Sequence, residues 1–158
     1  MHLIGMIMVD TDFRRLQNCA CFNVRKTSRM ITQLFDHALK PSGIKATQFT
    51  LLAVLANERE MTQGTMTIKE LSNSLGMERT TLTRGLVRLE REGLIKKHQG
   101  DDGRQRFVAL TPTGLKRLTD AIPFWEEAQA TMEKGLGDHF SGFLATLETA
   151  VKSQQIRQ

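Results

Sequence analysis

Threonine and arginine side chains recur between residues 78 and 92 at spacings that place them on one side of a helix. On a helical wheel three leucines fall on one face, and a threonine and two arginines fall nearly opposite. The leucines are Leu82, Leu86 and Leu89, and the opposite face carries Thr80, Arg84 and Arg91, with Arg88 flanking it and Thr81 to the side. Arginine can hydrogen-bond both acceptors of a guanine edge, and threonine can contact a phosphate or the methyl group of thymine. The pattern favours a helix that packs through its leucines and presents its polar face to the major groove of DNA.

The positive charge of the chain is concentrated around this helix. The net charge is +5 at pH 7 and the isoelectric point is about 9.6, which favours an anionic partner only weakly. Between residues 78 and 106 the basic residues are Arg79, Arg84, Arg88, Arg91, Lys96, Lys97, Arg104 and Arg106, against the acids Glu78, Glu90, Glu92, Asp101 and Asp102. From Thr111 onward the acids slightly outnumber the basic residues. A solvated surface helix would also carry such a face, so its interpretation depends on the neighbouring elements.

A β-hairpin is predicted directly after this helix. Short runs over 94–99 and 106–110 flank a segment with Asp102-Gly103, and glycine accepts the positive φ that a tight hairpin needs. Arg104 at the hairpin tip is well placed to enter a narrow minor groove, and Asp102 can hold it through a charge-assisted hydrogen bond. Two helices joined by a tight turn and followed by a hairpin are the order of a winged helix–turn–helix. The combination favours DNA binding over the solvated-face alternative.

Capping residues define the helices on either side of the hairpin. Thr67-Ile68-Lys69-Glu70 is a capping box that begins a short helix, and Gly76 ends it. Thr111-Pro112 begins a long helix, and Pro123 inside it predicts a kink or a local break. A last helix is expected after Gly137.

Amphipathic spacing predicts two further helices before the capping box. One is long and covers 12–39, and the second covers 48–57 with Thr47 as its cap, followed by a loop over 58–66. We therefore expect a mainly α chain with a small β-hairpin wing, in which a winged helix–turn–helix is combined with a helical dimerisation region. The expected divisions are an N-terminal arm and first dimerisation helix (1–45), the DNA-binding domain (46–111) and the C-terminal dimerisation helices (112–158).

The flanking helices carry more apolar surface than one small winged module can cover. We expect these stripes to meet in a homodimer, whose twofold symmetry would require a pseudo-palindromic operator. An intramolecular helical bundle is the alternative.

Other classes of protein find no support in the sequence. No apolar run approaches the roughly 18–20 residues of a membrane span, and the apolar start lacks the basic leader and cleavage site of a signal peptide. Two cysteines are too few for a disulfide framework, which favours the cytoplasm. The four histidines have no metal-ligand spacing, and no nucleophile, phosphate-loop or paired-carboxylate motif is present. We expect no cofactor, no metal, no membrane association and no enzymatic activity.

Residues 67–111 resemble the MarR family of winged-helix transcriptional regulators. The family's wing pattern D-x-R-x-x-x-V-x-L-T corresponds here to Asp102, Arg104, Val108, Leu110 and Thr111. The family's recognition helix and the residues that follow it also have counterparts here. They are similar to the run Leu75–Arg84 and to Leu89-Glu90-Arg91-Glu92-Gly93-Leu94-Ile95. The resemblance implies a homodimer whose N- and C-terminal helices interlock. Each winged-helix module would then bind one half-site of a pseudo-palindromic operator. It also implies that small phenolic or anionic ligands, or oxidants, loosen the DNA complex.

Three groups of candidate site residues follow from these patterns. The expected DNA contacts are Arg79, Thr80, Thr81, Thr83, Arg84, Arg88, Lys96, Asp102 and Arg104. The ligand pocket that the resemblance implies, between the first two helices and the Trp125 helix, has the candidates Phe22, Arg25, Phe49 and Trp125, for which plain core packing is the alternative. Arg25 is the member whose charge would select an anion.

The redox candidates are Cys19 and Cys21. Cys19 is expected on the apolar stripe of the first helix and Cys21 off it, so a disulfide between them would require unwinding. Some peroxide sensors of this family carry a reactive cysteine near the start of this helix, and tyrosine side chains support that cysteine. This chain has no tyrosine. Packing is the alternative role for Cys19.

The sequence thus favours a DNA-binding repressor that a small aromatic or anionic ligand relieves. The alternatives are an effector-independent or thiol-redox-responsive DNA binder and a winged helix that binds proteins instead of DNA.

Overall fold

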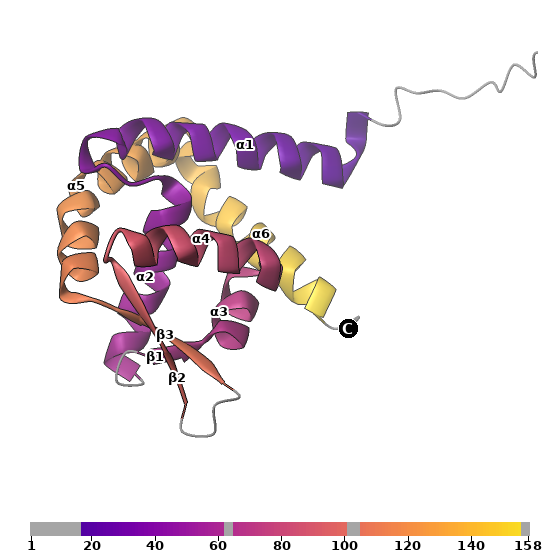
Figure 1. The fold of residues 1–158 in the computed structure, drawn as a ribbon. Helices are drawn as coiled ribbons and strands as arrows, with labels where there is room; N and C mark the ends of the chain where they lie inside the picture. The colour runs from indigo at the N-terminus through magenta and orange to yellow at the C-terminus, as the bar shows by residue number, and fades with distance from the viewer. Residues whose placement is uncertain (1–16, 62–64, 101–104, 156–158) are drawn as a thin grey trace, which may run out of the picture.

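In the computed structural model one small sheet lies at one end of a group of helices (Figure 1). The structure describes residues 17–61, 65–100 and 105–155. In chain order the elements are α1 (Ala20–Ala38), η2 (Lys40–Ser42), α2 (Ala46–Met61), β1 (Thr65–Thr67), α3 (Ile68–Leu75), α4 (Arg79–Arg91), β2 (Ile95–Gln99), β3 (Arg106–Leu110), α5 (Pro112–Leu136), η3 (Gly137–His139) and α6 (Phe140–Gln155). The predicted mainly α fold with a hairpin wing is confirmed.

The sheet has one strand more than predicted. β3 is central and pairs antiparallel with β2 and with β1, in the order β1-β3-β2. Met66 of β1 lies opposite Val108 and is buried. The loop predicted over 58–66 was wrong, because α2 continues to Met61 and β1 begins at Thr65. A three-residue strand is too short for a periodic signal, and its partner strand lies far along the chain.

The leucine face of α4 forms part of the core, as predicted. Leu82, Leu86 and Leu89 are each 0% exposed. They belong to one cluster with Leu71 of α3, against which Ile68 and Leu75 pack. This cluster also takes in residues outside 46–111, from the η2 connection and α5: Leu39, Ile44, Leu118 and Ala121. The winged module and the flanking helices therefore share a core.

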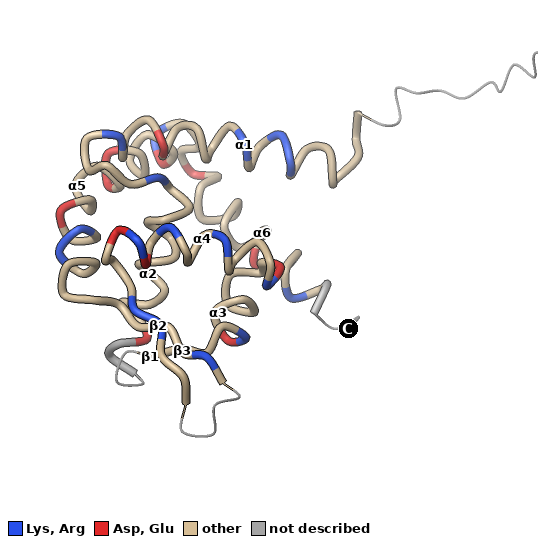
Figure 2. Tube along the Cα trace, viewed as in Figure 1, with Lys and Arg blue, Asp and Glu red and all other residues tan. Residues whose placement is uncertain are grey.

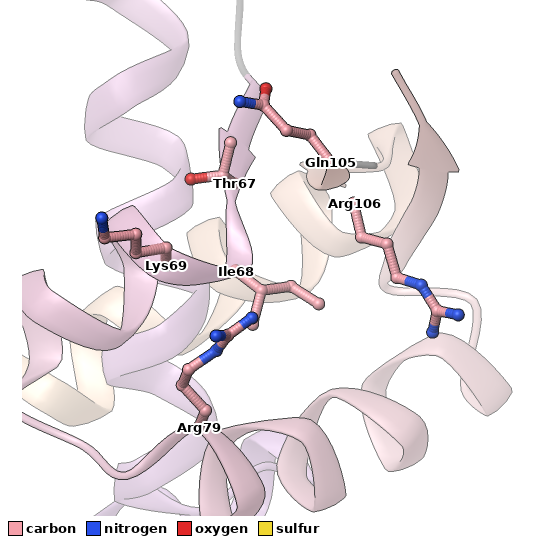
Figure 3. Close-up of a pocket in the computed structure, with 6 residues that line it drawn as sticks. All are labelled: Thr67, Ile68, Lys69, Arg79, Gln105 and Arg106. Carbon is pink, nitrogen blue, oxygen red and sulfur yellow. The ribbon is translucent and has the colours of Figure 1, made fainter. Parts of the chain in front are cut away.

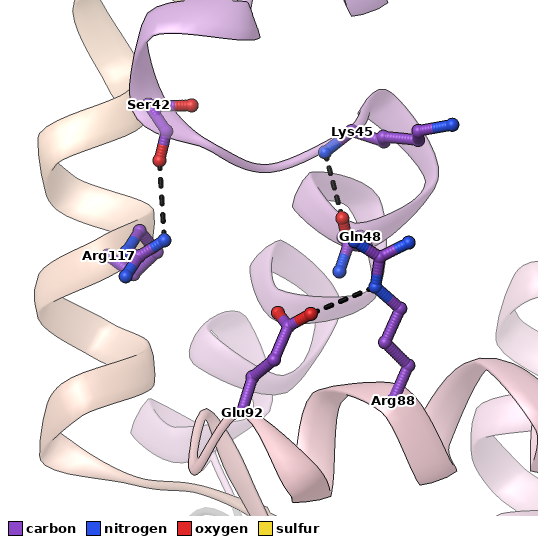
Figure 4. Close-up of polar contacts among 6 residues, drawn as sticks. All are labelled: Ser42, Lys45, Gln48, Arg88, Glu92 and Arg117. Atoms are coloured by element: carbon purple, nitrogen blue, oxygen red, sulfur yellow. Dashed lines mark hydrogen bonds and ion pairs between the residues drawn. The ribbon is translucent and has the colours of Figure 1, made fainter.

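The start of α2 is held by a distant side chain. The Ala46 N–H donates to Asp36 Oδ1 at 2.7 Å, and the Lys45 N–H donates to Gln48 Oε1 at 3.0 Å (Figure 4). Thr47, the predicted cap, lies one residue inside the helix. Its assignment was wrong because the capping carboxylate comes from α1, ten residues earlier.

Three other predicted helix termini are confirmed. The Thr67 hydroxyl accepts from the Glu70 N–H at 3.1 Å, and Glu70 Oε2 accepts from the Thr67 N–H at 2.8 Å. Gly76 ends α3 in the left-handed conformation, with φ 59°. Thr111 caps α5, which runs without interruption through Pro123, so the local break does not occur.

The flanking helices expose apolar side chains in the single chain. α1 begins at Ala20, and the part of the predicted helix before Gln17 lies outside the described residues. The exposed apolar side chains of α1 are Phe22, Val24 and Met30, and those of α6 are Leu144, Leu147 and Val151. Figure 1 shows both helices extending beyond the winged module. None of the described helices has the length and apolar character needed to cross a membrane.

Candidate nucleic-acid interface

The polar face of α4 is free of protein contacts over much of its length. The core leucines fix the rotation of the helix, so the residues opposite them point to solvent. Thr80, Thr81, Arg84, Val87 and Arg91 are all exposed. Figure 2 shows Lys and Arg residues along α4 and on the strands beside it. The helix can therefore present hydrogen-bond donors, a methyl-bearing side chain and positive charge together.

The cations of this surface fall into two groups. Arg88 Nε donates to Glu92 Oε1 at 2.9 Å (Figure 4), and Lys97 Nζ donates to Glu90 Oε2 at 2.8 Å. Over the described residues, the side chains of Arg79, Arg84 and Lys96 have no acidic partner. The second group keeps its whole charge for an external anion.

The remaining predicted DNA contacts are placed as follows. The Thr83 hydroxyl donates to the Arg79 carbonyl oxygen at 2.7 Å, so its proton is used within α4. Lys96 is exposed on β2. Asp102 and Arg104 lie outside the described residues.

The base of the wing is tied to the start of α5. The Thr111 hydroxyl lies 2.7 Å from the Gly93 carbonyl oxygen, and the Thr111 N–H donates to the Leu94 carbonyl oxygen at 3.1 Å. His98 and Phe107 stack across β2 and β3 with their centroids 5.3 Å apart. These contacts hold the two strands in a defined position relative to α4.

A basic pocket lies between the starts of α3, α4 and β3. It has a volume of about 320 Å³ and is lined by Thr67, Ile68, Lys69, Arg79, Gln105 and Arg106. Figure 3 shows the three cationic side chains arranged around Ile68. Two of them, Lys69 and Arg106, were not among the predicted contacts. The charge run gave a signal for Arg106, but only the fold brings Lys69 to the same pocket.

Val87 is a further residue that the sequence-based prediction omitted. It is 54% exposed on the polar side of α4. The helical wheel gives a signal for it, because Val87 falls between Thr80 and Thr83 and away from the leucines. An exposed valine methyl suits contact with a thymine methyl group.

The predicted ligand residues are only partly brought together. Phe49 and Trp125 stack with centroids 6.0 Å apart and ring planes 9° apart, joining α2 to α5. Phe22 and Arg25 are exposed near the start of α1. A larger groove of about 1080 Å³ runs between α1, the α3–α4 turn and α6, and its lining includes Val24, Met77, Arg79 and Leu147. Arg79 thus borders both this groove and the basic pocket.

Both cysteines are free and exposed. Cys19 is the N-cap of α1, with extended backbone at φ −66° and ψ 119°, and Cys21 lies in the first turn. The expected place of Cys19 on the helical stripe was wrong, because the helix begins one residue later. Among the described residues, no three His, Cys, Asp or Glu side chains are grouped so that they could hold a metal ion.

Comparison with known proteins places the chain in a family. The model of the MarR family matches residues 42–105. The chain is 33% identical over 97 residues to YwoH of Bacillus subtilis, an uncharacterised HTH-type transcriptional regulator, covering 61% of this chain and 67% of that one. It is 31% identical over 115 residues to the organic hydroperoxide resistance transcriptional regulator of the same organism, covering 71% and 75%.

Solved structures have the same fold. The transcriptional regulator MosR of M. tuberculosis, in complex with DNA, superimposes with a TM-score of 0.73 at 36% identity over 85% of this chain and 97% of that chain. A mutant MarR from E. coli, complexed with operator DNA, gives a TM-score of 0.74 at 21% identity over 89% and 99%. The chain belongs to the MarR family.

Proposed function

We propose that this protein is a transcriptional repressor that binds a pseudo-palindromic DNA operator as a homodimer and is released by a small aromatic or anionic ligand. The observation that carries the DNA-binding part is the exposed face of α4. There Arg79 and Arg84 have no acidic partner within the described part of the chain, and Thr80 lies beside them. The MosR structure, at 36% identity, is a complex with DNA. Cations that pair with no described acidic side chain suit an anionic partner such as DNA.

We assign base contacts to the residues opposite the leucines and phosphate contacts to those at the edges. Arg84 has the reach and the free guanidinium for bidentate contact with guanine. Arg79 at the start of α4 and Lys96 on β2 are the phosphate contacts. Arg88 is expected to contribute less than its charge suggests, because Glu92 already neutralises it.

The homodimer is supported by the apolar faces of α1 and α6. Leu144, Leu147 and Val151 follow 3-4 spacing and are all at least 39% exposed in the single chain. Exposed apolar side chains at this spacing favour burial against another helix. We propose 1–45 and 112–158 as the dimerising segments and 46–111 as the DNA-binding segment.

The ligand site is proposed at the junction of α1, α2 and α5. The stacked Phe49 and Trp125 supply an aromatic surface at this junction. The other proposed members, Arg25 and Phe22, lie near the start of α1, about 20 Å along the helix from its end at Ala38, so they would contact only a ligand site that extends along α1. A ligand that separates α2 from α5 would act on the winged module through the shared core.

The test is a gel shift with DNA from upstream of the protein's own gene, at two salt concentrations. Retarded complexes with a steep salt dependence are expected. Aromatic acids should then release the DNA and raise the melting temperature of the free dimer. No complex at low salt would contradict DNA binding, and DNA release by none of the acids would leave an effector-independent binder.

A thiol-redox response is the second candidate. Both cysteines are exposed, and Cys19 lies ahead of the helix, so joining it to Cys21 requires only the first turn to open. Hydrogen peroxide would convert one thiolate to a sulfenic acid with release of hydroxide, and the second thiol would displace water to form the disulfide.

The redox candidate is tested by measuring operator affinity before and after peroxide treatment, followed by dithiothreitol. A reversible loss in the wild type that is absent in Cys21→Ser supports it. Unchanged affinity after peroxide would overturn it.

A further inference from the structure

The basic pocket collects three cations from three separate elements. Lys69 lies in the first turn of α3, Arg79 is the first residue of α4, and Arg106 is the first residue of β3. All three are exposed at the surface around a volume of about 320 Å³ (Figure 3).

The backbone around the pocket is fixed by the fold. Thr67 of β1 pairs with Phe107 of β3, which sets the start of α3 beside Arg106. The capping box locks the same turn, and the buried Leu82 anchors the first turn of α4. The three cationic residues thus line one pocket, in which the Lys69 and Arg106 side chains are directed to opposite sides (Figure 3).

No described acidic side chain forms an ion pair with the cations of the pocket, Lys69, Arg79 and Arg106. Glu70 is adjacent, but its carboxylate accepts the N–H and the hydroxyl of Thr67. Glu78 precedes Arg79 and makes no side-chain cap on α4. Three cations outweigh the one carboxylate of Glu70 beside them, so among the described residues the balance of charge favours an anionic ligand.

We propose that this pocket seats a backbone phosphate of the bound DNA, with Lys69 and Arg106 as contacts in addition to Arg79. The inference rests on the proposed DNA binding. Guanidinium and ammonium groups donate charge-assisted hydrogen bonds to phosphate oxygens. The positive end of the α4 dipole adds to them. The seat would fix the position of α4 along the groove, because one side of the pocket is the first turn of α4 itself.

The test is the salt dependence of DNA affinity for Lys69→Gln, Arg106→Gln and Arg106→Lys. Each glutamine variant should lower the slope of log K against log salt, by at most about 0.9 for each module of the dimer, the value for complete loss of one phosphate contact. The loss of affinity should be equal on operator and unrelated DNA, because a phosphate carries no sequence information. Arg106→Lys should keep the slope, since a phosphate seat needs charge more than guanidinium shape.

Lys40→Gln is the matched control. Lys40 is an exposed lysine before α2, whereas β1 and the pocket follow the other end of this helix, whose 16 residues span about 24 Å. It should leave the slope unchanged. Thermal melts of all variants should match the wild type, because the side chains are exposed.

The outcomes separate the two proposals. If both glutamine variants show the same slope of log K against log salt as the wild type, the phosphate site is wrong and the proposed DNA binding still stands. A wild-type protein that binds no DNA would overturn the proposed function itself.

Discussion

The carbonyl oxygen of Leu94 occupies the space where a side chain on residue 114 would begin. A Cβ built on Gly114 would lie 2.0 Å from this oxygen. The Gly114 N–H donates to the Thr111 hydroxyl at 2.9 Å, so the same turn caps α5 and contacts the wing. Glycine is required here by the close approach of α5 to the first residues after α4.

Gly114→Ala is expected to lower the free energy of unfolding by about 1–3 kcal/mol, because the obstructing atom is backbone and cannot turn aside. Gly135→Ala is the matched control in the same helix, where nothing lies within 4 Å of the added Cβ. It should stabilise the protein by roughly 0.5–1 kcal/mol through helix propensity. Urea unfolding of both variants measures the difference, and equal effects would contradict the close packing.

The capping box of α3 predicts a pH-dependent stability. The Thr67 backbone N–H, and then its hydroxyl, hold the pKa of Glu70 below its ordinary value of 4.5, against an opposing effect of burial. A lowered pKa in the folded state stabilises the protein above the unfolded pKa, and this contribution disappears as the pH falls through the folded pKa. Glu70→Gln should therefore be less stable than the wild type at pH 7 and approach it below about pH 4.5. Thermal melts across this range measure the gap, and a constant gap would argue against an ionised cap.

Thr67→Ala removes the other half of the same box. The expected loss is about 0.5–2 kcal/mol at pH 7, typical of an N-cap. Thr119→Ala is a control, since its hydroxyl only returns to the Leu115 carbonyl within α5. Denaturant midpoints should fall for the first variant and hardly change for the second.

Arg84→Ala should weaken operator binding by roughly 1–3 kcal/mol and relax the preference at one base position. Arg84→Lys keeps the charge but loses the guanidinium fork, so it should keep the wild-type salt slope and still lose the base preference. Selection from a randomised half-site, with Kd measured for the selected sequences, distinguishes them. An unchanged preference in Arg84→Ala would remove Arg84 from base readout.

The apolar face of α6 predicts the effect of a charge in the dimer interface. Loss of one buried leucine is worth roughly 1.5–3 kcal/mol, so Leu147→Glu should raise the dimer dissociation constant at least about tenfold. Thr149→Glu is the control, because helical spacing places Thr149 away from the Leu144–Leu147–Val151 face. Sedimentation at several concentrations gives the constants. A dimer as tight as the wild type in Leu147→Glu would exclude this face from the interface.

The sequence predicted those structural elements that depend on residues close together in the chain. The capping box at Thr67, the leucine face of α4 and the cap at Thr111 each depend on residues within a few positions, and all three are confirmed. The third strand and the cap on α2 depend on β3 and on Asp36, which only the tertiary fold brings into place. The basic pocket escaped prediction for the same reason, because Lys69 and Arg106 are far apart in the chain.

The stack of Phe49 on Trp125 has a practical consequence for anyone studying this protein. The chain contains a single tryptophan and no tyrosine. Its near-ultraviolet emission therefore comes from one place, the contact between α2 and α5. Every quenching or wavelength shift of the unlabelled protein reports on the junction between the winged module and the flanking helices.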